Sequence, residues 1–216
     1  MKVGGAGPSG LDADAWCRLC TSFKSASNDL CNAIAVFAKR LCTVDLRSTG
    51  LAPYIACRLI PIDKNPGVRP IGIGEEVRHI FGKAVLSIIG KDIQKAAGAL
   101  QLCAGQPSGI EAAIHAISDF FARDDTDAVL LVDADSAFNQ LNRKAALHNI
   151  GVLCPALSTI LKNTYSMPAQ LFVGGEVILS EEGTTQGDPL AMPMYAIGVV
   201  PLIREPTQCN SGVVCR

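Results

Sequence analysis

Hydrophobic side chains recur along much of the chain at the three- and four-residue spacing of amphipathic helices. In residues 11–42 the apolar positions that follow this spacing include Leu30, Ile34, Phe37 and Leu41. Similar patterns occupy about 75–97, 108–121, 137–150 and 156–165. We expect each of these segments to be helical, with one face toward a core.

Shorter runs have the composition of strands. Residues 54–62 are rich in β-branched side chains, 63–67 contain the Asp, Asn, Pro and Gly of a turn, and 68–73 form a returning strand. A second hairpin is predicted where "QLFV" and "EVIL" are joined by Gly174-Gly175. Residues 128–133 are an unbroken apolar run that ends in Asp133, which predicts a strand buried on both faces. Because strands and helices do not alternate strictly, we expect an α+β fold and not a doubly wound sheet.

Two helix starts are predicted from capping residues. Ser108 and Glu111 have the spacing of a capping box. Asp188 precedes Pro189, an Asp N-cap followed by proline at the first helical position, so the last helix should begin there. We therefore assign Asp188 to the helix cap and not to metal binding.

Composition and charge narrow the class of protein. The chain has 216 residues, of which 49% are hydrophobic and 18% charged, as in a folded domain. The apolar stretch from Leu190 to Ile203 is too short to span a bilayer, and the start lacks the apolar core of a secretory signal. We expect an intracellular protein, in the cytoplasm or nucleus, with no membrane partner.

The net charge is −1, but residues 1–95 carry +5 and residues 96–216 carry −6. A basic half suits phosphate contacts and an acidic half suits divalent metal.

The nine cysteines are scattered along the chain. Cys17 and Cys20 have Cys-x-x-Cys spacing, but no second pair or nearby histidine completes a zinc set. We interpret the cysteines as buried free thiols in a reducing compartment, with no disulfide partner implied.

The segment "LLVDADSAFNQL" (130–141) carries the main chemical signal. A carboxylate at a strand end suits Mg²⁺, although an Asp in that place can also cap the following helix. The segment resembles the first metal-binding motif of reverse transcriptases, an Asp followed five residues later by an aromatic residue. The resemblance implies that Asp133 is a catalytic ligand of Mg²⁺, with Mn²⁺ as a possible substitute. It also implies that Phe138 lies against the sugar of the incoming nucleotide and leaves no room for a 2′-hydroxyl, which points to DNA as the product. Plain core packing is the alternative for Phe138.

Two further segments resemble the same family. "EEGTTQGDPLAMPMYAI" (181–197) is similar to its Gln-Gly-x-Pro motif. There Gln186 is expected to contact template or nucleotide, and Gly187 to let the backbone approach the nascent base pair. "RLIPIDKNPGVRPIGIG" (58–74) is similar to the fingers hairpin, in which Lys64 and Arg69 would hold the triphosphate of the nucleotide. Solvated surface charges are the alternative for both cations.

The resemblance extends to "GGAGPSGLDADAW" (4–16) and "AGQPSGIEAAIHAI" (104–117), which are similar to segments of retrotransposons without long terminal repeats and of group II intron relatives. It implies a right-hand polymerase architecture, with a fingers-like part at 1–104, a partial palm with an incomplete sheet at 105–203, and a non-homologous tail at 204–216. The implied partners are an RNA template, a DNA primer and deoxynucleoside triphosphates.

The family's Asp-Asp pair should follow residues 186–203, but 204–216 contain no Asp. Two-metal nucleotidyl transfer needs carboxylates beyond Asp133. We therefore expect a fragment of an RNA-directed DNA polymerase that is inactive alone, from a truncated or frame-shifted mobile element or a gene prediction that ended early. The alternatives are a remnant that binds nucleic acid or protein without catalysis, and a product that misfolds.

Overall fold

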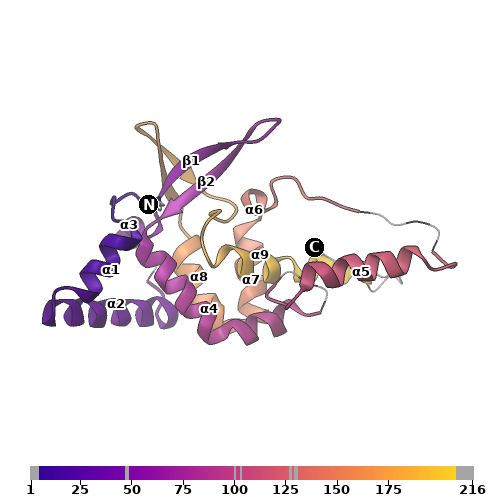
Figure 1. Cartoon of the computed structure of the whole chain (residues 1–216), viewed down its shortest axis with the longest axis horizontal. Coiled ribbons are helices and arrows are strands. Elements are labelled where there is room, and N and C mark those ends of the chain that lie inside the picture. Colours follow the sequence, from indigo (N-terminus) through magenta and orange to yellow (C-terminus); the bar gives the residue numbers. More distant parts are fainter. Residues whose placement is uncertain are drawn as a thin grey trace.

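The structure is a computed structural model that describes residues 5–46, 49–99, 101–102, 104–126, 128 and 131–207. Helices and a four-stranded sheet are combined in it, so the expected α+β class is confirmed. Two β-hairpins project from one side of the helices, and helices α1 and α5 lie at opposite ends of the molecule (Figure 1).

Two helices occupy the region 11–42 that was predicted to be helical, α1 (Ala13–Thr21) and α2 (Ser25–Thr43). Asp12 caps α1, because its Oδ1 accepts a hydrogen bond from the Ala15 N–H at 2.8 Å. A short 3₁₀ turn (Thr49–Leu51) and helix α3 (Ala52–Ile55) lead to the sheet. The predicted strand 54–62 was therefore wrong at its start, since Pro53 lies in the first turn of α3, where a proline is well tolerated.

The sheet consists of the two predicted hairpins. Their strands are β1 (Cys57–Asp63), β2 (Val68–Gly74), β3 (Ala169–Val173) and β4 (Glu176–Ser180), in the order β2-β1-β3-β4. Strands β1 and β3 are parallel and pair only through Cys57–Leu171 and Arg58–Phe172. The hairpins are consequently joined near their bases and diverge toward their tips (Figure 1).

The remaining helices largely follow the predicted segments. They are α4 (Glu76–Ala97), α5 (Gly109–Phe121), α6 (Ala137–Gln140), α7 (Arg143–Leu153), α8 (Pro155–Tyr165), α9 (Ala191–Gly198) and α10 (Val200–Thr207). The single helix expected at 137–150 is divided, because Asn142 leaves the helical conformation and caps α7 by accepting the Ala145 N–H at 2.9 Å. Helix α10 also continues past the predicted boundary at 203, and residues 208–216 of the expected tail lie outside the described residues.

The capping box predicted at Ser108 was wrong. Ser108 precedes α5 but has a left-handed backbone, with φ at 51°, and its side chain makes no capping hydrogen bond. An N-cap hydroxyl reaches the first turn from an extended backbone, which Ser108 does not have.

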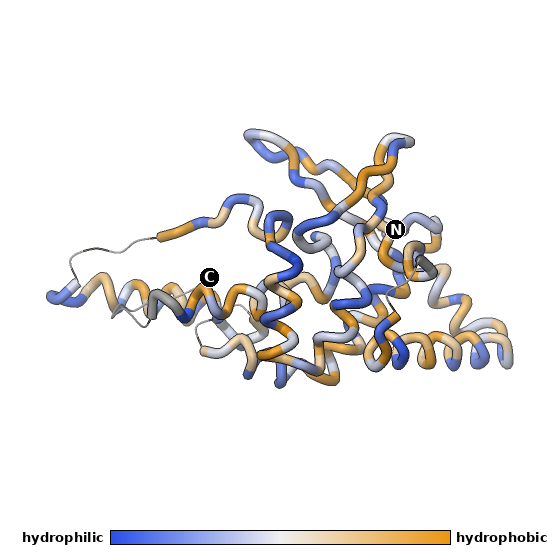
Figure 2. Tube along the Cα trace, turned by 180° about the vertical axis from the view of Figure 1, so that it is seen from behind, coloured by the Kyte–Doolittle hydropathy of each residue, from blue (hydrophilic) through white to orange (hydrophobic). Residues whose placement is uncertain are grey.

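The buried strand predicted at 128–133 was also wrong over the described residues 131–133. Leu131 and Val132 have no strand conformation and are 76% and 84% exposed. None of the described strands pairs with them, so their backbone makes no hydrogen bonds to a neighbouring strand among the described residues. Asp127, Val129 and Leu130 lie outside the described residues. Figure 2 shows hydrophobic residues on α5 and on the described residues that lead into α6.

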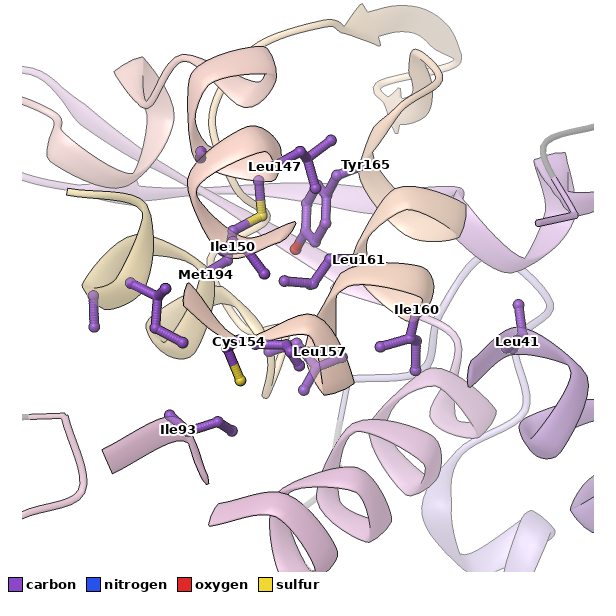
Figure 3. Packing of buried hydrophobic residues seen from close by; sticks show 14 of the residues in the cluster. Leu41, Ile93, Leu147, Ile150, Cys154, Leu157, Ile160, Leu161, Tyr165 and Met194 are labelled. Carbon is purple, nitrogen blue, oxygen red and sulfur yellow. The ribbon is translucent and has the colours of Figure 1, made fainter. Parts of the chain in front are cut away.

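The core lies among helices α2, α4, α7, α8 and α9 (Figure 3). It joins the two predicted parts of the chain, since Leu41 and Phe81 belong to the same buried cluster as Leu157 and Ile197. Asn163 fastens α2 to α8, because its side-chain amide donates to the carbonyls of Leu41 at 2.9 Å and Val44 at 2.8 Å. Among the described residues, no helix has the length and hydrophobicity needed to cross a bilayer.

The described cysteines are free thiols, but they are not uniformly buried as predicted. Cys57 and Cys154 are buried, whereas Cys17 on α1 and Cys31 on α2 are exposed. Cys31 approaches Cys20, whose carbonyl oxygen lies 3.8 Å from its sulfur, a proximity that the Cys-x-x-Cys spacing did not indicate. Cys103, Cys209 and Cys215 lie outside the described residues.

Candidate functional site

A pocket of about 590 Å³ lies between the hairpin β1–β2, the segment that contains α6, and the loop that precedes α9. These three walls come from distant parts of the sequence. All of the candidate site residues predicted from the sequence line this pocket: Lys64, Arg69, Asp133, Phe138, Gln186 and Gly187.

Lys64 and Arg69 form the cationic side of the pocket. The turn of the hairpin is closed by a hydrogen bond from the Lys64 N–H to the Gly67 carbonyl at 3.0 Å. Arg69 lies just after this turn on β2, where it pairs with Ile62 of β1. Both side chains are exposed. The ion pairs found among the described residues join Arg78 to Asp188 and Arg123 to Asp125. Both hairpin cations are therefore available to a ligand.

Phe138 lies on α6 and is half-buried. Its ring centroid is 5.0 Å from that of Tyr195 on α9, with the ring planes inclined by 34°. The Phe138 carbonyl accepts a hydrogen bond from the Thr184 N–H at 2.6 Å, and the Leu141 carbonyl accepts one from the Gly183 N–H at 2.9 Å. The loop before α9 thus holds α6 by its backbone, so that Phe138 both packs against a neighbour and lines the pocket.

Gln186 and Gly187 line the pocket from the loop before α9. Gly187 has φ at 108°, and a Cβ there would lie 3.1 Å from the Gly72 carbonyl oxygen on β2, so glycine suits this position for conformation and for space. The Gln186 side chain donates through Nε2 to Oδ1 of Asn139 at 3.4 Å. Asn139, which was not predicted from the sequence, also lines the pocket and follows Phe138 directly.

Asp133 is exposed and belongs to the pocket lining. It is not the cap of the next helix, because the residue at the N-cap of α6 is Ser136. No group of three or more His, Cys, Asp or Glu that could hold a metal gathers among the described residues. Asp133 could contribute one oxygen ligand to a hydrated Mg²⁺ ion whose other ligands come from a phosphate-bearing molecule.

Asp188, the other acidic residue among the described lining residues, is buried. Its Oδ1 accepts the Leu190 N–H at 2.9 Å, but α9 begins only at Ala191, with Leu190 at the N-cap position, so the predicted helix start at Asp188 was wrong. The other carboxylate oxygen, Oδ2, is engaged elsewhere. It accepts hydrogen bonds from Arg78 Nη2 at 2.5 Å, Arg78 Nε at 3.1 Å and the Tyr165 hydroxyl at 2.6 Å.

The charges of this buried pair stabilise one another. Burial acts to raise the pKa of Asp188, but the Arg78 guanidinium and the Tyr165 hydroxyl outweigh it and hold that pKa below its ordinary value. Burial acts to lower the pKa of Arg78, and the Asp188 carboxylate raises it well above the usual range. Burial raises the pKa of Tyr165, so its hydroxyl is a proton donor to the carboxylate.

Arg143 supports the same loop from helix α7. Its guanidinium donates to the carbonyls of Gly183 at 2.7 Å and Ser180 at 2.8 Å, and its backbone N–H donates to Glu182 Oε2 at 3.0 Å. Neither this arginine nor Arg78 was predicted to matter. A signal existed for Arg78, since it lies three and seven residues before Phe81 and Val85, on the apolar face of α4, where a charge needs a partner.

Compared with known proteins, the chain matches no family model and no curated protein. The pocket is therefore the basis for assigning a function. Exposed cations on one wall, an aromatic ring and two side-chain amides on the others, and a carboxylate in the lining suit an elongated, phosphate-bearing ligand that arrives with a divalent cation.

Proposed function

We propose that the pocket is the nucleotide site of a reverse-transcriptase-type polymerase fold and binds a deoxynucleoside triphosphate together with Mg²⁺ or Mn²⁺. One observation carries this proposal. Six residues chosen from three distant segments, on their resemblance to three separate polymerase motifs, line one pocket. Their position in one pocket supports a shared role in binding one ligand.

Each residue has a chemical role in the proposal. Lys64 and Arg69 hold the triphosphate, because a cationic side chain and a forked guanidinium match its negative oxygens. Asp133 contributes an oxygen ligand to the metal. Phe138 lies against the sugar, and the Gln186 amide with the Gly187 backbone contacts the base or the template. On this assignment, 1–104 is the fingers-like part and 105–203 the partial palm, with an RNA template and a DNA primer as partners.

We further propose that this chain does not extend primers alone. Two-metal transfer uses shared carboxylates to hold ions about 4 Å apart. The acids among the described lining residues are Asp133 and Asp188, and Asp188 is already bonded to Arg78 and Tyr165. Asp133 by itself cannot hold two ions in that arrangement.

The test is calorimetric titration of the protein with dGTP and Mg²⁺, followed by the same titration of two variants. Asp133→Asn should weaken metal-dependent binding, whereas Asp135→Asn, two residues away and outside the pocket lining, should not. Binding of dGTP that is absent, or that is unchanged by Asp133→Asn, would refute the nucleotide site. Primer extension on an RNA template, with Mg²⁺ or Mn²⁺, should show no product, and extension that depends on Asp133 would overturn the proposed inactivity. RNA binding without any nucleotide binding would favour a non-catalytic remnant.

A further inference from the structure

Arg78 connects two walls of the pocket, the hairpin β1–β2 and the loop before α9. The side chain is 3% exposed. On one side Nη1 donates to the Ile55 carbonyl at 3.3 Å and to the Cys57 sulfur at 3.5 Å, where strand β1 begins. On the other side Nε and Nη2 donate to Asp188, where the loop before α9 ends. One guanidinium therefore joins the base of the hairpin to the Gln186–Gly187 loop.

Tyr165 provides a second connection. Its hydroxyl donates to Asp188 Oδ2 at 2.6 Å and accepts the Thr185 N–H at 3.4 Å, so it bonds to residues on both sides of Gln186–Gly187. Its ring lies within the core beside Leu147 and Leu161 (Figure 3). The guanidinium carbons of Arg78 and Arg143 are 5.3 Å and 5.5 Å from the centroid of this ring. The hydroxyl consequently has a fixed position.

The two walls also touch directly, through glycines. A Cβ on Gly72 of β2 would lie 2.6 Å from the Thr185 methyl carbon, and a Cβ on Gly187 would lie 3.1 Å from the Gly72 carbonyl oxygen. Because so little space separates β2 from the loop, a small shift of either wall changes the distance from Lys64 and Arg69 to Gln186.

We propose that Arg78, Asp188 and Tyr165 are positioning residues that fix the hairpin β1–β2 relative to the Gln186–Gly187 loop and thereby set the geometry of the ligand site. The consequence for ligand binding rests on the proposed function. Stability alone is a poor reason for this cluster, because a buried ion pair is often no more stabilising than apolar side chains of similar volume. The hydrogen bonds of the cluster instead fix the relative position of the two walls. They reach the start of β1, the Asp188 carboxylate at the end of the loop, and the Thr185 backbone within the loop.

The first experiment uses Tyr165→Phe, which removes one hydroxyl and keeps the ring, with Ser27→Ala as the control. Ser27 is also buried, and its hydroxyl accepts from the Phe23 N–H and donates to the Leu19 carbonyl, between α1 and α2 and outside the pocket lining. Hydrogen exchange should accelerate at the amides of Thr185 to Gly187 in Tyr165→Phe and not in Ser27→Ala. The dissociation constant for dGTP with Mg²⁺ should rise only in Tyr165→Phe, by up to about tenfold, because the lost hydrogen bond to a charged group limits the free energy available to hold the loop in place. Equal effects of the two variants on the loop would overturn the proposal.

The second variant, Arg78→Lys, keeps the charge but replaces the planar guanidinium, which uses three nitrogens to reach both walls, with a single ammonium group. Exchange should accelerate together at the start of β1 and in the loop, while amides of α2 and α8 keep their rates. Acceleration throughout the core would mean a purely structural role and would overturn the proposal. If the wild-type protein binds no dGTP, the proposed function fails, but coupled exchange at the two walls still supports the positioning role and its absence refutes it.

Discussion

Gly183 lies so close to Asn139 that a Cβ on Gly183 would be 2.2 Å from the Asn139 carbonyl oxygen. Gly183 also has φ at 70°, a conformation that other residues adopt at a cost. At this contact the loop before α9 packs directly against α6, the helix that carries Phe138. The atoms that a side chain would meet belong to the backbone, so they cannot yield by a rotamer change.

Gly183→Ala should therefore displace α6 and lower the free energy of unfolding by about 3 kcal/mol, the sum of left-handed strain and overpacking. Gly174→Ala is the matched control, because Gly174 has φ at 57° but nothing within 4 Å of the place that a methyl group would occupy. It should lose only about 1 kcal/mol from strain. Urea unfolding of both variants measures the difference. Similar losses would mean that the contact with Asn139 costs nothing.

Asp188→Asn should lower the free energy of unfolding by about 3 kcal/mol near neutral pH, because it leaves the buried Arg78 charge without its carboxylate. The Asp188 pKa is held below its ordinary 3.8, so its contribution is present above that value and is lost as the pH falls through the lower folded pKa. The gap between wild type and variant should stay constant above about pH 5 and narrow below 3.8.

Urea unfolding across that pH range measures the gap, with Asp125→Asn as the control. Asp125 forms an ion pair of similar length with Arg123, at 2.8 Å, but on the surface. Water screens such a pair, so this control should show no comparable loss. A gap that widens on acidification would contradict the ionised state assigned to Asp188.

The helices and hairpins were predictable because their signals are local. Gly174-Gly175 specify a tight turn with positive φ at both residues, and the hairpin formed where they predicted it. The strand at 128–133 failed for the opposite reason. Apolar composition favours burial between neighbouring strands, but it cannot say whether a neighbour is present, and Leu131 and Val132 have none among the described strands.

The candidate site likewise contains residues that could be predicted from local sequence and residues that could not. Residues within a motif, such as Gln186 and Gly187, were found because the motif's letters are contiguous in the sequence. Arg78 and Tyr165 were missed because their partners are distant, as with Asp188, which is 110 residues after Arg78. An arginine on an apolar helix face indicates a buried partner, but only the tertiary structure identifies the carboxylate.

If the pocket is the proposed nucleotide site, replacing Lys64 or Arg69 by alanine should weaken binding of dGTP with Mg²⁺ by about tenfold each, because each would remove charge-assisted contacts to the triphosphate. Lys39→Ala removes an exposed charge from α2, outside the pocket lining, and should have no effect. Titration with dGMP separates the roles further. If these cations hold the outer phosphates, neither variant should change binding of the monophosphate, and an equal loss for both nucleotides would exclude that contact.

The ring of Phe138 is supported by Tyr195 and lies on a helix fixed by the loop at Gly183 and Thr184. In the proposed nucleotide site this ring would lie against the sugar and leave no space for a 2′-hydroxyl. Phe138→Val should therefore improve binding of GTP relative to dGTP by about tenfold, mostly through tighter GTP binding. Phe172→Val, a similar truncation on β3 outside the pocket lining, should leave the ratio unchanged. Titration of each variant with both nucleotides gives the ratio. If Phe138→Val weakens both nucleotides equally, Phe138 contributes packing alone and does not select the sugar.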